Sequence, residues 1–101
     1  MDIDIAEPVV YVLANEDRSF VHVGATWTLH STIFNIRRNP SEYFSCDYGY
    51  LKVVYIQRFD TYSEAKIYRS YLAVAMRLFK RIIIGIHNPK WRDLLPNEDI
   101  M

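Results

Sequence analysis

The stretch VYVLANEDRSFVHVGAT at residues 10–26 has the pattern of two short strands joined by a polar turn. β-Branched and aromatic residues at positions 9–13 favour a buried strand, and the polar run at 15–18 favours the turn. Residues 20–24 then form the partner strand.

The second strand of the hairpin presents different side chains on its two faces. Because strand residues alternate, Phe20, His22 and Gly24 share one face, and Val21 and Val23 share the other. His22 is therefore either a residue of a cleft or a hydrogen-bonded histidine of the core. Spacing alone favours the core histidine.

A first helix is predicted between the hairpin and Pro40. Either Thr26 or Thr28 can cap its start, and Asn39 with Pro40 ends it at about Arg38. Its inward-facing stripe consists of Leu29, Ile33 and Ile36.

Residues 51–59, LKVVYIQRF, predict a third strand whose continuous apolar run places it inside the sheet. Thr61 and Glu64 follow at the spacing of a capping box, so a second helix begins there. The residues expected to be buried on that helix are Ala65, Tyr68, Leu72, Met76 and Phe79. The segment RIIIGIH at 81–87 is compatible with a strand, but we interpret it as helix with a break near Gly85.

The order of these elements predicts a small α+β domain with a three-stranded antiparallel sheet flanked by helices. A chain of 101 residues has room for one domain. We expect that domain to occupy residues 1–101, with its core at 8–95 and acidic tails at both ends.

Composition restricts the class of protein. Half of the residues are hydrophobic and 15% are aromatic, which excludes the composition of a disordered chain. The acidic start lacks the basic flank of a secretory segment, and no apolar run approaches the roughly 20 residues that cross a bilayer. We therefore expect a soluble, intracellular protein without a membrane partner. Cys46, the one cysteine, can form no intrachain disulfide, and we expect an incidental or buried thiol there.

The charges are unevenly distributed although the net charge is zero. Residues 1–30 hold five acidic side chains and one basic side chain, and residues 93–101 hold three acidic ones. Residues 31–92 hold eleven lysines or arginines and four acidic residues. This basic middle can attract a polyanion such as DNA or RNA, although a solvated surface covered by acidic ends explains it equally well.

Three motifs stand in a recognisable order. YVL contains Tyr11, HVG contains His22, and NPKWRDL occupies residues 88–94. Together they resemble the GIY-YIG nuclease domain, and most closely its small stand-alone branch, whose chains end in Asn-Pro-x-Trp-Arg-Asp-Leu. The resemblance covers residues 8–95 and implies a GIY-YIG-like fold with a metal-assisted phosphodiesterase site.

The resemblance implies roles for particular positions. In the family, hairpin tyrosines position or deprotonate the attacking water, and the motif glycine lets the backbone pass closely at a strand end. Tyr11 matches the first tyrosine, His22 replaces the second, and Gly24 matches the glycine. Asn88 matches the asparagine of the closing signature. An imidazole can accept a proton near neutral pH, so the exchange at His22 alone would not end the chemistry.

Two further positions depart from the family. Thr32 stands where the family has a catalytic arginine, and Arg69 stands where it has the glutamate that holds a divalent metal. Loss of one hydrogen-bond donor to the transition state typically raises the activation free energy by about 2.7–4 kcal/mol. The guanidinium of Arg69 would also repel a metal cation. Glu64 is the nearest other carboxylate, but as a residue of the capping box it is expected to be occupied with the start of its own helix. The implied site is therefore vestigial, with no metal ligand and no cofactor.

These departures predict a catalytically degenerate domain that binds DNA or RNA through a basic helix face without cleaving it. In the former metal position, the guanidinium of Arg69 can neutralise a phosphate directly. The predicted phosphate contacts are Arg37, Arg38, Lys66, Arg69, Arg77, Lys80 and Arg81. An ordinary solvated helix face is the other interpretation of the same cations.

Two other functions stay open. An aromatic loop containing Tyr43, Phe44, Tyr48 and Tyr50 suits a protein-interaction or structural subunit, alone or within a larger assembly. A metal-dependent endonuclease with a rearranged site is the other, and only this reading requires Mg²⁺.

The two tryptophans have different expected roles. Trp91, in the closing signature, is expected to anchor the core. Trp27 can stack on a base or on a partner's surface, or it can be partly buried at the start of the first helix.

Overall fold

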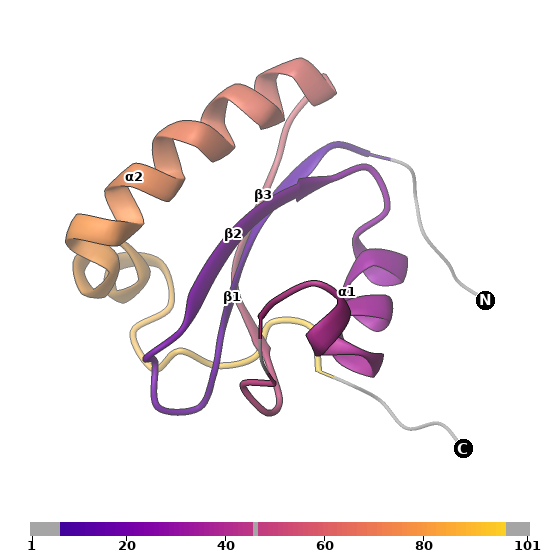
Figure 1. Cartoon of the computed structure of the whole chain (residues 1–101). Coiled ribbons are helices and arrows are strands. Elements are labelled where there is room, and N and C mark those ends of the chain that lie inside the picture. The colour runs from indigo at the N-terminus through magenta and orange to yellow at the C-terminus, as the bar shows by residue number, and fades with distance from the viewer. Residues whose placement is uncertain (1–6, 46, 97–101) are drawn as a thin grey trace.

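The computed structural model describes residues 7–45 and 47–96, which form the predicted α+β architecture of helices and a three-stranded antiparallel sheet (Figure 1). The elements are β1 (Val9–Ala14), β2 (Val21–Thr26), α1 (Leu29–Arg38), the 3₁₀ helix η1 (Pro40–Glu42), β3 (Lys52–Arg58) and α2 (Tyr62–His87). Cys46 and most of both acidic tails lie outside the described residues. Within the described part of the chain, no helix is both long and apolar enough to cross a membrane.

The predicted hairpin is confirmed, with β1 and β2 paired antiparallel. Asn15 closes the turn, because its side-chain oxygen accepts from the Phe20 N–H at 2.9 Å and its amide donates to Ser19 Oγ at 3.0 Å. Arg18 takes the left-handed conformation with φ of 64°. β2 begins at Val21, one residue later than expected.

β1 is the central strand, because the strand order is β2-β1-β3. The prediction that the third strand lies inside the sheet is therefore wrong. β3 still buries three consecutive residues, Val53, Val54 and Tyr55, because packed elements cover both of its faces. The chain after α2 also covers its outer edge: the Leu94 N–H donates to the Val53 carbonyl at 2.7 Å. The continuous apolar run marks a covered strand and not a central one.

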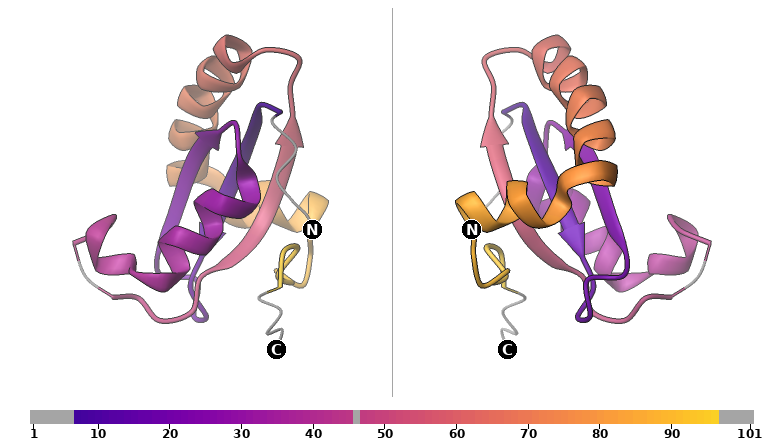
Figure 2. Two further views of the ribbon diagram at one scale, coloured as in Figure 1. Left: turned by 90° about the vertical axis from the view of Figure 1, so that its right-hand side faces the viewer. Right: turned by 90° about the vertical axis from the view of Figure 1, so that its left-hand side faces the viewer.

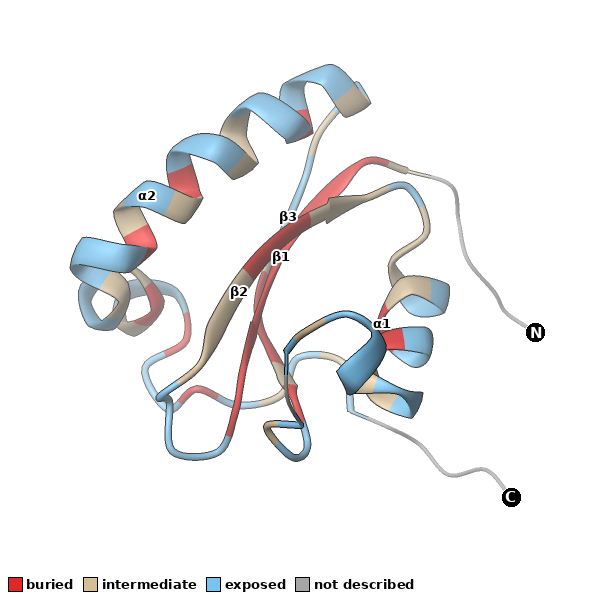
Figure 3. Cartoon of the chain, viewed as in Figure 1, coloured by how far each residue is buried: buried red, intermediate tan, exposed pale blue. Residues whose placement is uncertain are grey.

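The two helices lie on opposite faces of the sheet (Figure 1). Alternate residues of β1 supply both faces: Val10 and Val12 join the cluster under α2, and Tyr11 and Leu13 join the cluster under α1. Figure 3 shows β1 buried along its length between these layers. The expected inward residues of α1 include Ile33 and Ile36, which are buried, and Leu29, which is partly buried.

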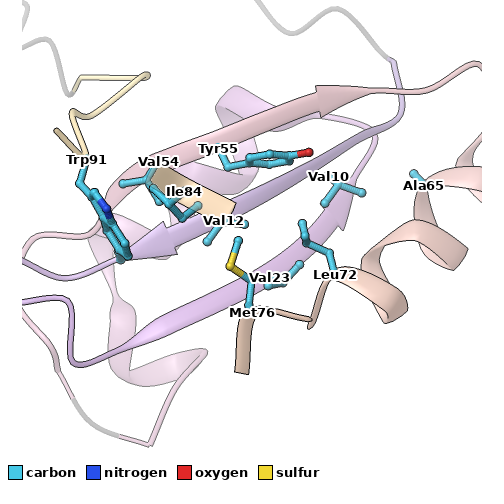
Figure 4. Close-up of a cluster of buried hydrophobic side chains, with 11 residues drawn as sticks. Val10, Val12, Val23, Val54, Tyr55, Ala65, Leu72, Met76, Ile84 and Trp91 are labelled. Atoms are coloured by element: carbon cyan, nitrogen blue, oxygen red, sulfur yellow. The ribbon is translucent and has the colours of Figure 1, made fainter. Parts of the chain in front are cut away.

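α2 begins as predicted. Thr61 Oγ1 accepts the Glu64 N–H at 3.1 Å, which satisfies one of the free donors at the helix start. Of the residues expected to be buried, Ala65, Leu72 and Met76 are buried and Tyr68 is partly buried (Figure 4). The segment 81–87 is helical, as interpreted from the sequence.

α2 bends at Phe79, whose φ of −134° and ψ of 32° are not helical. After the bend the helix crosses the face of the sheet (Figure 2). The predictions that Phe79 is buried and that the break lies near Gly85 are both wrong. The bend changes which side of the helix meets the sheet, so Phe79 is 53% exposed and Ile84 becomes the buried residue.

The chain after α2 is held by Asn88 and Trp91. The Asn88 amide donates to the Val54 carbonyl at 3.1 Å and to the Arg92 carbonyl at 2.8 Å, and its oxygen accepts the Arg92 N–H. Trp91 is buried at one end of the α2-side cluster, beside Ile84 and Val54 (Figure 4). Its expected role as a core anchor is confirmed.

Candidate nucleic-acid interface

A groove of about 320 Å³ lies between the edge strand β2 and α2. It is lined by Val21, His22, Val23, Arg69, Ala73, Met76 and Arg77. Two of the predicted site residues, His22 and Arg69, therefore meet here from elements far apart in the sequence. Because β2 is an edge strand, the groove is open to solvent at its outer side.

His22 combines the two environments that its position in the strand left open. It lines the groove, and its ring also packs edge-on against Phe44 with centroids 4.9 Å apart. Burial lowers the pKa of His22 below its usual range, and the nearby charge of Arg69 lowers the pKa further. The imidazole is therefore neutral at pH 7.

Tyr11 lies beside His22, with ring centroids 6.2 Å apart, and is buried. Burial, and to a smaller extent the neighbouring Tyr62 and Tyr43, raise the pKa of Tyr11 to about 12, although Arg69 acts to lower it. The Tyr11 hydroxyl is therefore protonated at neutral pH and is suited to donating a hydrogen bond.

Gly24 is paired directly with Tyr11 across the two strands. A Cβ at this position would overlap the hydroxyl end of the Tyr11 ring. Glycine is required here because the tyrosine ring lies over the backbone of the neighbouring strand. A left-handed backbone conformation is not the reason.

Thr32 and Asn88 are used for hydrogen bonds within the fold. Thr32 Oγ1 is 2.7 Å from Thr26 Oγ1, a bond that ties α1 to the end of β2. Asn88 is buried against Val54 and Arg92, as described above, and does not line the groove. Of the positions implied by the resemblance, Tyr11 lies beside His22 and opposite Gly24, and only His22 and Arg69 share the groove.

The predicted phosphate-contacting cations do not form a single surface. Arg37 is nearly buried and is held by both oxygens of Asp93 at 2.9 Å, by the Leu51 carbonyl at 2.9 Å and by the Leu95 carbonyl at 2.6 Å. This geometry leaves Arg37 no free donor face for a phosphate. Arg38 is exposed but lies on α1, on the opposite side of the sheet from α2.

The remaining predicted cations all belong to α2. Arg69 and Arg77 line the groove, and Lys66 lies one turn before Arg69. Lys80 donates to the Arg18 carbonyl at 2.7 Å, and Arg81 is exposed beyond the bend. The basic helix face therefore reduces to Lys66, Arg69 and Arg77 before the bend.

Two aromatic features were harder to anticipate. Trp27 is 47% exposed and stacks on Tyr62, with centroids 5.4 Å apart and planes at 24°. In the aromatic loop, Phe44 and Tyr48 pack around Phe20, whereas Tyr43 and Tyr50 are about half exposed. That loop is neither a free docking surface nor a packed one. The only signal in the sequence for the stack of Trp27 on Tyr62 was the tryptophan just before the first helix.

The groups around the groove do not suit a divalent metal ion. They supply an imidazole, two guanidinium groups and, nearby, a protonated phenol, whereas Mg²⁺ requires carboxylate or other oxygen ligands. Across residues 7–45 and 47–96, no group of three or more His, Cys, Asp or Glu side chains could hold a metal.

No protein-family profile, curated protein or solved structure matches this chain. The relationship to GIY-YIG nucleases stays a prediction based on the three motifs.

Proposed function

We propose that this chain is a catalytically silent GIY-YIG-like domain that binds a single-stranded nucleic acid along α2. The observation that carries this proposal is the groove between β2 and α2, whose lining includes His22, Arg69 and Arg77. A half-exposed aromatic stack lies at the start of the same helix. Cations for phosphates and a ring for a base are the two components that single-strand binding needs.

The cations and the stack share one side of α2. Tyr62, Lys66, Arg69 and Arg77 are separated by four, three and eight residues, spacings that place side chains on one helix face. At 1.5 Å per residue, the row is about 22 Å long. The Lys66 ammonium is 5.6 Å from the centre of the Tyr62 ring, so the first cation adjoins the stack. A backbone running along this row would meet three successive positive charges.

The stack favours a single strand over a duplex. Trp27 already has Tyr62 on one side, so a base can add only to its exposed side. A base that stacks on an aromatic side chain must be unpaired, as in single-stranded DNA or RNA. Nothing in this arrangement selects a 2′-hydroxyl, so both polymers are expected ligands.

The groove supports binding without hydrolysis. In the family, hydrolysis requires a metal-binding glutamate carboxylate at the position that Arg69 occupies. A guanidinium at that position repels a divalent cation. Thr32 supplies no charge to stabilise a phosphoryl transition state. The same Arg69 is well suited to a charge-assisted hydrogen bond with a phosphate oxygen.

Fluorescence anisotropy with labelled single-stranded DNA and RNA of about 20 nucleotides tests the proposal. Because three cations release counterions, log K should fall by about 2 for each tenfold rise in salt. Arg69→Ala and Arg77→Ala should each reduce that slope by about 0.7. Trp27→Ala should weaken binding by about 1–3 kcal/mol with little change in the slope.

Arg38→Ala is the matched control, because Arg38 is an exposed arginine on the other side of the sheet. It should leave both affinity and slope unchanged. Absence of binding at about 0.05 M salt, or a flat salt dependence, would refute the proposal. Equal losses for Arg38→Ala and Arg69→Ala would also refute it, because the α2 face would then have no special role.

A plasmid-nicking assay with Mg²⁺ and with Mn²⁺ tests the silent site. We expect no nicking above background. Nicking that disappears in His22→Ala would contradict the proposal and would favour a metal-dependent endonuclease with a rearranged site.

A further inference from the structure

The outer side of α2 carries a row of exposed apolar side chains, here called the apolar stripe. Its members are Ile67, Tyr71, Val74, Leu78, Ile82 and Ile86, with Phe79 beside them at the bend. Before the bend, Ile67, Tyr71, Val74 and Leu78 recur at intervals of four, three and four residues, so they lie along one side of the helix. After the bend, Ile82 and Ile86 lie on the exposed side of the next helical segment. Their exposed fractions run from 53% to 73%, and the outer side of α2 is exposed along its length in Figure 3.

The apolar stripe is large for a protein of this size. With roughly 100 Å² for an aliphatic side chain and 200 Å² for an aromatic one, these fractions leave about 550 Å² of apolar surface in water. The largest apolar patch on a typical monomer covers about 300–600 Å² and is often functional. This stripe therefore lies near the upper end of that range on a chain of 101 residues.

We propose that the apolar stripe is the interface of a homodimer, in which α2 of one copy packs against α2 of a second. Covering both stripes would remove about 1,100 Å² of apolar surface from water. Because such interfaces are about 65% apolar, the total buried area would be about 1,700 Å². This value lies within the range of about 1,200–2,000 Å² for stable complexes. A second copy also carries a stripe of matching length, as a two-fold interface requires.

The bend of α2 provides a place for a knob from the second copy. A surface hollow of about 370 Å³ lies there, lined by Leu78, Phe79 and Ile82 together with the cations Arg77, Lys80 and Arg81. Large side chains inserted into such hollows contribute most of the energy of typical interfaces. In the proposed dimer, a large side chain of the second copy occupies this hollow at the bend.

The charges of α2 form the rim of this interface and predict how salt acts on it. The helix carries five lysines or arginines and one acidic residue, Glu64. Two such helices repel each other, and salt screens the repulsion. The dimer should therefore tighten as salt rises, whereas nucleic-acid binding should weaken. The opposite signs separate the two proposals.

Sedimentation velocity over about 1–100 μM protein measures the association. The wild-type chain should sediment as a dimer of about 24 kDa, against 12.0 kDa for the monomer. Leu78→Glu buries a charge in both copies and should raise the dissociation constant by about 30-fold or more. Tyr71→Glu, two stripe residues further from the bend, is a second variant should Leu78→Glu fail to fold.

Phe34→Glu is the matched control, because Phe34 is 58% exposed on α1, away from the stripe. It should leave the dimer intact. A wild-type protein that stays at 12.0 kDa in both low and high salt overturns the proposal. Equal dissociation by Phe34→Glu and Leu78→Glu overturns it as well. Binding of a monomeric protein to phosphatidylserine vesicles, lost in Leu78→Glu, would show that lipid covers the stripe instead.

Discussion

Replacing Asp93 with alanine tests the clamp that joins α1 to the chain after α2. Both carboxylate oxygens of Asp93 accept from Arg37 at 2.9 Å, and one also accepts the Val53 N–H at 3.0 Å. The Tyr50 hydroxyl and the Leu95 N–H donate to the same carboxylate. This carboxylate therefore connects three segments of the chain: α1, residues 50–53 and the chain after α2.

The magnitude follows from the burial of this pair. The side chains of Arg37 and Asp93 are only 9% and 14% exposed, so Asp93→Ala leaves a guanidinium charge nearly buried without its partner. Breaking a buried pair in this way costs about 3–5 kcal/mol. A domain of this kind has a total unfolding free energy of about 5–15 kcal/mol. The melting temperature should fall by about 4–8 °C for each kcal/mol, or at least about 12 °C in total.

Urea unfolding followed by the fluorescence of buried Trp91 measures the loss. Asp60→Ala, which removes an exposed carboxylate, is the control and should change the unfolding free energy by less than about 0.5 kcal/mol. The double variant Arg37→Met, Asp93→Leu should recover part of the stability, because it removes both buried charges together but leaves the Val53 N–H without its acceptor. A loss below about 1 kcal/mol for Asp93→Ala would refute the reasoning, and Arg37 would again be a candidate for phosphate binding.

The remaining predictions concern Tyr11, Gly24 and His22. Gly24→Ala should destabilise the fold by about 1–3 kcal/mol in urea unfolding, because its methyl group overlaps the Tyr11 ring. Adding Tyr11→Leu should recover part of that loss, and strictly additive losses would contradict the overlap. The pKa of His22 is lowered in the folded state, so unfolding free energy should decrease as pH falls below about 6.5 and should stay constant above it. His22→Asn should remove this dependence on pH. An NMR titration should show a higher pKa for His22 in Arg69→Ala, and an unchanged pKa would contradict the influence of Arg69.

Local patterns in the sequence predicted most of the secondary structure. The alternation around His22 predicted that Val21 and Val23 lie on the opposite face of the strand from Phe20; in the structure they pack in the cluster under α2 and Phe20 packs in the cluster under α1. The spacing of Thr61 and Glu64 located the start of α2, because a capping contact joins residues three apart. These signals depend only on neighbouring residues, so they can be read without the fold.

The candidate site was predicted less completely. Tyr11 lies beside His22 and opposite Gly24, and His22 shares the groove with Arg69, but the roles implied by the resemblance stay predictions. The sequence did not distinguish Arg37 from Arg38, which are adjacent on α1. One is nearly buried against Asp93 and the other is exposed, because the side chains of neighbouring helical residues point in different directions.

The sequence by itself determined where strands and helices form and which of their faces are apolar, since these are periodic properties of the local chain. The tertiary structure alone decided that β1 is central, that α2 bends at Phe79 and that Arg37 is held by Asp93. Each of these depends on contacts between residues distant in sequence, which no local period encodes. The exposure of the apolar stripe was decided in the same way: α2 has apolar residues on two sides, and packing against the sheet covers only one of them.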